Sequence, residues 1–211
     1  MSTPTIPTVD LDDLRAEGPR LEAAALGLRE AFGSYGLVYV RGHGIDPALL
    51  DRYYDLFVQL TRRDEAAKRS LARPDIWYQR GYTPPNTEQA VAAGGQPDFK
   101  ECYFAAPFDA DPELQLQYPE IYADNLWPEG LPGFADTYLA LSHALHGAGE
   151  ALLRGAAVAL GLDAARFTDA IAGGPHITRA LRYIPLTPAQ IDGGVLWGEE
   201  HTDFNLLTLL P

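Results

Sequence analysis

Apolar residues recur at helical spacing along several stretches of this chain. Residues 14–32 carry them seven, four, three and four positions apart, and a second helix is expected to start at Asp46, because an aspartate caps free backbone N–H groups and the proline that follows suits a first helical turn. The longest helix is expected over residues 133–160, between Pro132 and Gly161. Its buried face is predicted to consist of Phe134, Tyr138, Leu141, Leu145, Ala148 and Leu152.

Strand patterns appear in three other places. Residues 36–44 are β-branched and aromatic and lie between glycines, which predicts a buried strand. Two more strands are expected over residues 177–186 and 201–210. Residues 206–210 are apolar apart from Thr208, so the last strand is expected to be covered on both faces.

Residues 72–131 differ in kind, because they are rich in Pro, Gly, Tyr and Trp. They are interpreted as loops and short extended pieces, such as 98–107, that lie over a core without forming a separate domain. Helices come mostly first and strands later, which predicts an α+β plan with helical support of a sheet. A length of 211 residues is compatible with one large domain or two small ones.

The charge balance narrows the classes of partner. The net charge is −13 and the isoelectric point is near 4.6, which argues against a nucleic-acid binder and against docking on an anionic membrane. Cys102 is the only cysteine, so an intrachain disulfide and a cysteine-based zinc cluster are both excluded. The amino terminus has no cationic start followed by an apolar run, and the chain has no long uncharged apolar stretch, so a cytoplasmic protein is expected.

One tripeptide suggests metal chemistry. On a strand, His201 and Asp203 would project from the same face, because side chains alternate with a period of two. An imidazole and a carboxylate side by side are two of the three ligands of a 2-His-1-carboxylate centre, which holds Fe(II) with open positions. Taken alone the tripeptide is weak, since a His and an Asp at an exposed strand entrance are the more common explanation.

Three other groups carry weaker signals. His143, His146 and Glu150 fall within one sector of the longest helix, but opposite its apolar stripe, so a solvated face is favoured over a metal site. Cys102 is expected to be a small buried side chain rather than a nucleophile. Arg80, Lys100 and Glu101 would either form an ion pair that connects two loops or line the entrance to a substrate pocket.

As a set, these pieces resemble the non-haem iron(II)- and 2-oxoglutarate-dependent oxygenases, in the isopenicillin N synthase-like branch. The segments that carry the resemblance, in chain order, are IPTVDL (6–11), GLVYVRGHGI (36–45), RGYTPP (80–85), DFKECYF (98–104), NLWPEGLPGF through ALGLD (125–163), LRYIP (181–185) and HTDFNLLTLL (201–210). Any one of these motifs is weak, but several in register over nearly the whole chain are specific.

The resemblance implies a site and its cofactors. His201 and Asp203 would be the first two iron ligands, and Tyr183 would help to bind 2-oxoglutarate. The cofactors would be Fe(II), 2-oxoglutarate as cosubstrate and O2, and a small-molecule substrate would be oxidised with release of succinate and CO2. Substrate contacts are expected from the loop region, at Arg80, Tyr82 and Lys100.

The resemblance also implies an architecture. The expected fold is a double-stranded β-helix, or jelly roll, with a helical amino-terminal part. Residues 1–211 would form a single oxygenase domain that is incomplete at its carboxyl end. Its parts would be amino-terminal helices, strands and covering loops over 1–131, supporting helices over 132–175, and the first core strands over 176–211.

The sequence departs from the family pattern in two respects, and two alternatives stay open. A second iron-binding histidine and an arginine for the distal carboxylate of 2-oxoglutarate cannot be placed, and both are expected beyond Pro211. If the chain were complete, weak iron binding and no turnover would be expected. The alternatives are an isopenicillin N synthase-type iron oxidase that does not use 2-oxoglutarate, and a non-catalytic remnant or binding module of the same fold.

Overall fold

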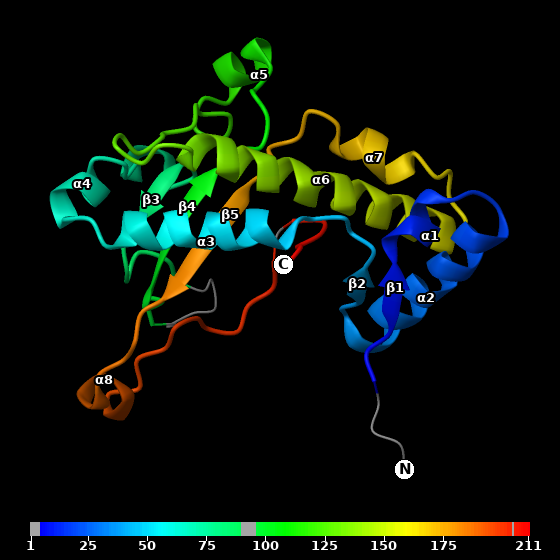
Figure 1. The fold of residues 1–211 in the computed structure, drawn as a ribbon, viewed down its shortest axis with the longest axis horizontal. Helices are drawn as coiled ribbons and strands as arrows, with labels where there is room; N and C mark the ends of the chain where they lie inside the picture. The colour runs from blue at the N-terminus through cyan, green and yellow to red at the C-terminus, as the bar shows by residue number, and fades with distance from the viewer. Residues whose placement is uncertain (1–4, 90–95, 204) are drawn as a thin grey trace. The chain divides into compact units, whose positions relative to one another are not determined.

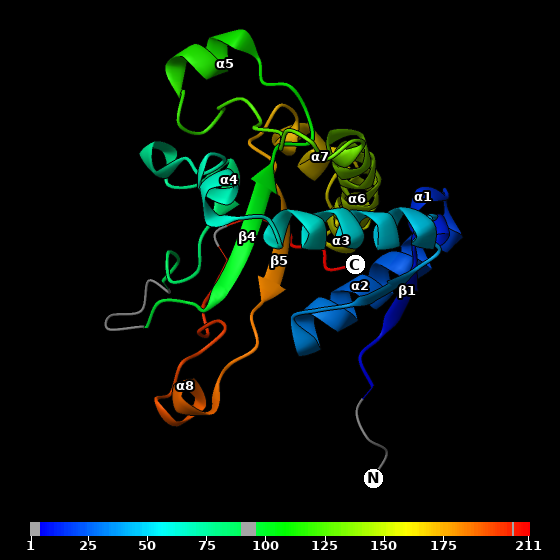
Figure 2. The same cartoon turned by 60° about the vertical axis from the view of Figure 1, so that its left-hand side comes forward.

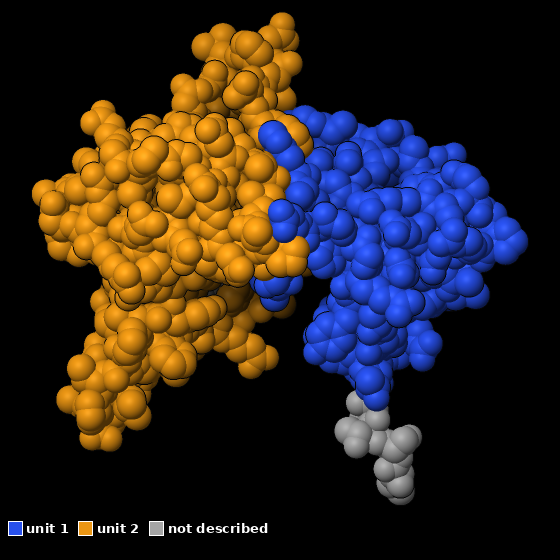
Figure 3. Space-filling view, in the orientation of Figure 1, with its two compact units in different colours: residues 1–46, 143–174, 209–211 blue, residues 47–142, 175–208 orange. Residues whose placement is uncertain are grey.

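The computed structural model describes residues 5–89, 96–203 and 205–211. Its residues divide into two compact units, which are distinguished by colour in Figure 3. Unit 1 comprises Met1–Asp46, His143–Gly174 and Leu209–Pro211, and unit 2 comprises Pro47–Ser142 and Pro175–Thr208. Helix α6 (Phe134–Ala159) contributes residues to both units, and the other helices and strands each belong to one.

Unit 1 contains a β-α-β arrangement. Strand β1 (Thr8–Asp10) pairs in parallel with β2 (Tyr39–Arg41), and the chain between them forms α1 (Leu11–Arg15) and α2 (Pro19–Tyr35), as Figure 1 shows. Helix α7 (Arg166–Ile171) follows α6 in the same unit. Parallel strands need such a crossover connection, because a tight hairpin can join only antiparallel neighbours.

The single helix expected over residues 14–32 is two helices in the structure. Gly18 has a φ of 61°, and Pro19 has no N–H to donate to the preceding turn, so the chain breaks between α1 and α2. The predicted apolar stripe is confirmed from Leu14 to Leu28, where every member is buried, but not at its last member, Phe32, which is 38% exposed.

Helix α6 confirms the longest predicted helix and packs closely on α1 within unit 1. The guanidinium of Arg154 donates to the carbonyl oxygens of Leu14 at 2.6 Å and Ala16 at 2.8 Å, which satisfies carbonyls at the end of α1. At Gly155, a Cβ atom would lie 2.5 Å from Cδ2 of Leu14 and 2.8 Å from Cδ1 of Leu28. The missing side chain of Gly155 therefore allows this close approach.

The buried strand expected over residues 36–44 is shorter and more exposed than the sequence indicates. Strand β2 spans three residues, and Tyr39 is 58% exposed. Among the described residues, β2 is hydrogen-bonded only to β1, so one of its edges has no strand beside it. The prediction that this strand is buried is therefore wrong for this structure.

Unit 2 is built on an antiparallel sheet in the order β3-β4-β5. Its strands are β3 (Gly81–Thr83), β4 (Lys100–Ala105) and β5 (Thr178–Tyr183), and Figure 2 shows β4 and β5 side by side. All residues of β3 and β4 are buried, and β4 is the central strand. The other elements of unit 2 are α3 (Pro47–Thr61), α4 (Glu65–Arg69), a 3₁₀ turn (Pro74–Ile76), α5 (Pro112–Gln117) and α8 (Pro188–Asp192).

The two faces of this sheet have different environments. On one face, the ring of Tyr103 contacts the ring of Tyr138 on α6, and the Tyr138 hydroxyl bonds the carbonyl oxygens of Tyr103 and Thr178 at 2.9 Å each. The other face carries Lys100 and Cys102, because successive residues of a strand point to opposite sides.

Residues 72–131 were expected to form loops and short extended pieces that cover a core. In the structure they also contain β3 and β4, which are buried and form part of the core.

The strand expected over residues 201–210 does not form. Residues 201–203 and 205–211 adopt bends and irregular backbone, and Leu206 and Leu210 are 61% and 86% exposed. A strand covered on both faces needs neighbours that accept its backbone hydrogen bonds, and the described residues provide none for this segment. The strand at residues 177–186 is confirmed as β5.

The close contact at Gly155 makes a stability prediction. A Gly155→Val variant is expected to lower the free energy of unfolding by about 1–3 kcal/mol, because the new side chain overpacks against Leu14 and Leu28. The matched control is Gly147→Ala on the same helix, where a Cβ meets no atom within 4 Å. It should raise stability by up to about 1 kcal/mol through helix propensity. Urea denaturation measures both, and a Gly155→Val protein as stable as the wild type would contradict the packing described.

Candidate functional site

His201 and Asp203 lie next to each other in unit 2, on irregular chain instead of the expected strand. Nε2 of His201 is 3.5 Å from Oδ1 of Asp203, and the two side chains are 49% and 51% exposed, so a ligand can reach both. With metal–ligand bonds of about 2.1 Å, two donors at adjacent coordination positions are about 3.0–3.4 Å apart. The spacing of this pair is therefore close to that of two ligands on one metal ion.

Contacts behind the pair orient both donors. Nδ1 of His201 lies 2.7 Å from the carbonyl oxygen of Glu199, and because a carbonyl only accepts, a hydrogen bond there requires the proton of the imidazole on Nδ1. Oδ2 of Asp203 accepts from the Thr208 hydroxyl at 2.6 Å, and that hydroxyl accepts from the Asn205 amide at 2.8 Å. Nε2 and Oδ1 face each other, while Nδ1 and Oδ2 have the kind of hydrogen-bond partners that orient metal ligands.

The pair fits iron as two ligands of three. An imidazole nitrogen with a carboxylate oxygen is the donor combination of non-haem Fe(II) centres. Within the described ranges, no group of three or more His, Cys, Asp or Glu side chains could hold a metal ion. A complete 2-His-1-carboxylate set is therefore not present among these residues.

Tyr183 ends β5 and lies directly opposite Lys100 of β4 in the strand register. Its side chain is exposed, and its ring centroid is 6.0 Å from that of Trp197. Nε1 of Trp197 donates to the carbonyl oxygen of Ile184 at 2.7 Å, so this aromatic pair connects the end of β5 with the segment that leads to His201. A role of Tyr183 in binding 2-oxoglutarate stays a prediction.

Lys100 is buried in an ion-pair cluster at the start of β4. Its Nζ lies 2.5 Å from Oδ2 of Asp98 and 3.3 Å from Oε2 of Glu88. Burial lowers the pKa of Lys100, but the hydrogen bond with Asp98 and the charge of Glu88 outweigh it, so the net direction is upward. Lys100 is therefore a protonated, paired ammonium inside the unit.

Tyr82 and Glu101 lie on the opposite face of the sheet from Lys100. The Tyr82 hydroxyl donates to Oε2 of Glu101 at 2.7 Å, and burial together with this carboxylate raises the pKa of Tyr82 far above its ordinary value. Glu101 also pairs with Arg182 at 2.7 Å and Lys68 at 3.5 Å. These contacts connect β3, β4, β5 and α4, so they stabilise the sheet.

The guanidinium of Arg80 is almost fully buried and holds a loop to the start of β3. It donates to the carbonyl oxygens of Gln79, Ile121 and Ala123 at 2.7, 3.0 and 2.9 Å. The observed contacts of Arg80, Tyr82 and Lys100 therefore stabilise the structure of unit 2. Their expected contacts with substrate stay predictions.

The histidines of α6 have the environment that their position opposite the apolar stripe predicts. His143 and Glu150 are exposed, and Nε2 of His146 is 3.5 Å from Oε1 of Glu150. A solvated helix face is therefore confirmed at His143 and Glu150, whereas the side chain of His146 is only 19% exposed.

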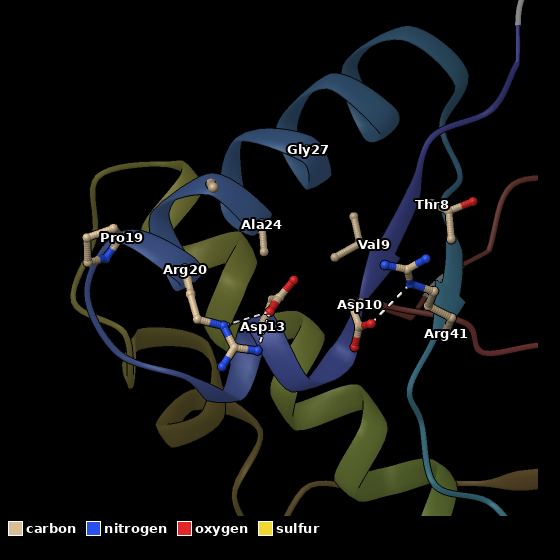
Figure 4. A pocket seen from close by; sticks show the side chains of 10 residues that line it. Thr8, Val9, Asp10, Asp13, Pro19, Arg20, Ala24, Gly27 and Arg41 are labelled. Carbon is tan, nitrogen blue, oxygen red and sulfur yellow. Dashed lines mark hydrogen bonds and ion pairs between the residues drawn. The ribbon is translucent and has the colours of Figure 1, made fainter.

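Unit 1 also contains an open pocket of about 440 Å³ beside β1 and α2. Its charged side chains pair with one another, Arg20 with Asp13 at 2.5 Å and Arg41 with Asp10 at 3.0 Å, as Figure 4 shows. Since these charges are already compensated and none of the residues expected at a site lines this pocket, it is not the candidate site.

The residues that hold His201 and Asp203 in position were not predicted from the sequence. The main ones are Asp98, Glu199 and Thr208. Asp98 stands two positions before Lys100 on an extended segment, so a shared face was readable from the sequence. Its contact with Glu199 joins residues 101 positions apart, and no local pattern signals such a contact.

Comparison with known proteins gives the family. Residues 6–130, more than half of the chain, match the family model described as "non-haem dioxygenase in morphine synthesis N-terminal". The chain belongs to the non-haem dioxygenase family. This confirms the resemblance that the sequence motifs carry.

Similar proteins include two enzymes of known name. Validamycin A dioxygenase of Streptomyces hygroscopicus subsp. limoneus is 27% identical over 226 residues, which include 99% of this chain and 58% of that protein. Homoarginine-6-hydroxylase of Oryza sativa subsp. japonica is 31% identical over 197 residues, which include 87% of this chain and 56% of that protein. The chain thus spans somewhat more than half the length of these non-haem dioxygenase relatives.

A solved structure confirms the fold class. A full-length Neurospora crassa protein in complex with alpha-KG superimposes with a TM-score of 0.77 at 22% identity, over 94% of this chain and 61% of that chain. The jelly-roll fold with a helical amino-terminal part, expected from the sequence, is therefore confirmed. Among the described residues, no helix is both long enough and apolar enough to cross a membrane.

Cys102 provides a prediction about reactivity. Its thiol is fully buried, and burial raises the pKa of Cys102 to about 11 despite the nearby guanidinium of Arg179. About one thiol in a thousand is then ionised at pH 8. The native protein is expected to resist alkylation by iodoacetamide at pH 8 and to react fully in guanidinium chloride, with Cys102→Ala as the unlabelled control. Rapid alkylation of the native protein, followed by mass spectrometry, would contradict this burial.

Proposed function

We propose that this chain carries the first two iron ligands of an Fe(II)- and 2-oxoglutarate-dependent oxygenase that oxidises a small molecule. The observation that carries the proposal is the 3.5 Å approach of Nε2 of His201 to Oδ1 of Asp203, in a chain of the non-haem dioxygenase family. The second histidine ligand has no counterpart among the described residues, so the activity is proposed for the whole protein.

In this proposal, His201 and Asp203 hold Fe(II), and Tyr183 contributes to the binding of 2-oxoglutarate. A small set of protein ligands leaves coordination positions open for cosubstrate and oxygen. The iron would supply oxygen activation when bound, coupled to the conversion of 2-oxoglutarate to succinate and CO2. Thr208 and the Glu199 carbonyl keep the two donors oriented toward the metal.

The names of similar proteins support a small substrate and these cofactors. Relatives include the validamycin A dioxygenase and leucoanthocyanidin dioxygenases, and the similar Neurospora crassa protein was also solved in complex with alpha-KG and thymine. Arg80, Tyr82 and Lys100 remain the proposed substrate contacts. A cytoplasmic location remains part of the proposal as well, and nothing in the acidic surface suggests a nucleic-acid or membrane partner.

The test is oxygen uptake and succinate formation by the whole protein with Fe(II), with and without 2-oxoglutarate. Both are expected to require 2-oxoglutarate and to fall at least about 100-fold in His201→Ala and Asp203→Ala, because each change removes a metal ligand. The matched control is His143→Ala, which removes an exposed imidazole from α6 and should leave turnover unchanged.

Other results would change the assignment. Oxygen uptake that needs iron but neither consumes 2-oxoglutarate nor yields succinate would identify the oxidase alternative. Iron content that is the same in the wild type and in His201→Ala would show that His201 is no ligand, which would contradict the proposed site.

A further inference from the structure

Asp98 connects the start of β4 with the segment that precedes His201. Oδ2 of Asp98 accepts from Lys100 at 2.5 Å, and Oδ1 accepts from the backbone N–H of Glu199 at 3.1 Å. The backbone N–H of Phe99 donates to the carbonyl oxygen of Leu196 at 2.9 Å. The segment 196–199 is therefore fastened to the start of β4 at two points.

The anchor at Asp98 is buried, which makes it strong. Asp98 and Lys100 are 5% and 6% exposed, so their mutual attraction is little screened by water. A Cβ atom on Gly198 would lie 3.9 Å from Nζ of Lys100 and 4.0 Å from Oδ2 of Asp98. The backbone of the segment thus lies directly against the ion pair.

The same residue that Asp98 holds also orients the imidazole. Glu199 receives the Asp98 contact at its N–H and offers its carbonyl oxygen to Nδ1 of His201 at 2.7 Å. Neutral imidazole carries one proton, so a proton held on Nδ1 leaves a lone pair on Nε2. Nε2 is the nitrogen that faces Oδ1 of Asp203.

We propose that Asp98 is a positioning residue for the metal centre: by fixing the backbone of Glu199, it holds the proton of His201 on Nδ1 and presents Nε2 as the ligand. This inference rests on the proposed function for the identity of the metal. Its structural part, the tautomer of His201, holds in the metal-free protein and is measurable there.

The first experiment records long-range ¹H–¹⁵N correlation spectra of the imidazoles in the metal-free protein at a pH where His201 is neutral. The His201 signals are assigned by their loss in His201→Ala. The proposal expects the Nδ1–H tautomer for His201. A predominant Nε2–H tautomer in the wild type would overturn it, whatever happens to the variants.

The second experiment compares variants of Asp98. In Asp98→Ala, His201 is expected to shift toward the Nε2–H tautomer, and the affinity for Fe²⁺ in anaerobic equilibrium dialysis should fall about 10–100-fold, the usual effect of losing an outer-shell partner. Asp98→Asn keeps an oxygen that can accept from the Glu199 N–H, so it should retain the Nδ1–H tautomer. If Asp98→Ala does not fold, Asp98→Ser takes its place, because its shorter side chain withdraws the acceptor from the Glu199 N–H, and the same shift and loss of affinity are expected.

The matched control is Glu88→Gln. The Glu88 carboxylate pairs with Lys100 and Arg179 in the same cluster, whereas the N–H of Glu199 is bonded to Asp98, so Glu88→Gln weakens the cluster and keeps the bond to the segment. In Glu88→Gln, His201 is expected to keep the tautomer of the wild type, and the affinity for Fe²⁺ is expected to stay within about twofold of the wild type. An Asp98→Ala protein with unchanged tautomer and affinity would overturn the role of Asp98, whereas Fe²⁺ binding that does not depend on His201 would overturn the proposed function instead.

Discussion

The carboxylate of Asp98 is buried, and a buried carboxylate needs a counter-charge and hydrogen-bond donors to offset the loss of water. Lys100 provides the charge from the same strand face, and the backbone N–H of Glu199 provides a further donor from a distant part of the chain. Both requirements are met only when segment 196–199 lies against the start of β4. The burial of this charge therefore fixes the position from which the chain continues to His201.

The candidate site consequently lies at one end of the β3-β4-β5 sheet of unit 2. Strand register places Tyr183 opposite Lys100, and Trp197 connects the end of β5 to the segment before His201. Irregular backbone can hold a metal ligand in this setting, because its position is set by contacts with a buried strand and not by its own hydrogen-bond ladder. The exposure of His201 and Asp203 leaves them reachable while the residues behind them are fixed.

The sequence correctly predicted those helices and strands that can be recognised from the spacing of their own residues. The apolar stripe of α6 could be read directly, because a helix face is defined by spacing alone, and the extended segment that contains β5 was also located from the sequence. The break at Gly18 and Pro19 was missed, since the apolar spacing continues across it. The strand over 201–210 was predicted wrongly, because a strand depends on neighbours that its own residues do not specify.

At the candidate site too, the features that depend on local spacing were predicted, and those that depend on contacts between distant segments were not. His201 and Asp203 were predicted to be neighbours from a period of two, and they are neighbours although the strand is absent. The family motifs, not the tripeptide, made that prediction specific. The role of Asp98 could not be predicted, because it depends on the burial of a charge and on a contact between segments far apart in sequence.

Locating a bound metal ion tests most directly whether His201 and Asp203 form the metal site. Mn²⁺ added to the ¹⁵N-labelled protein broadens the signals of nearby nuclei. If His201 and Asp203 hold the metal, selective broadening is expected at the backbone amides of residues 199–203 and at the indole N–H of Trp197. Broadening centred on residues 143–150 of α6, or none that depends on His201 and Asp203, would contradict it.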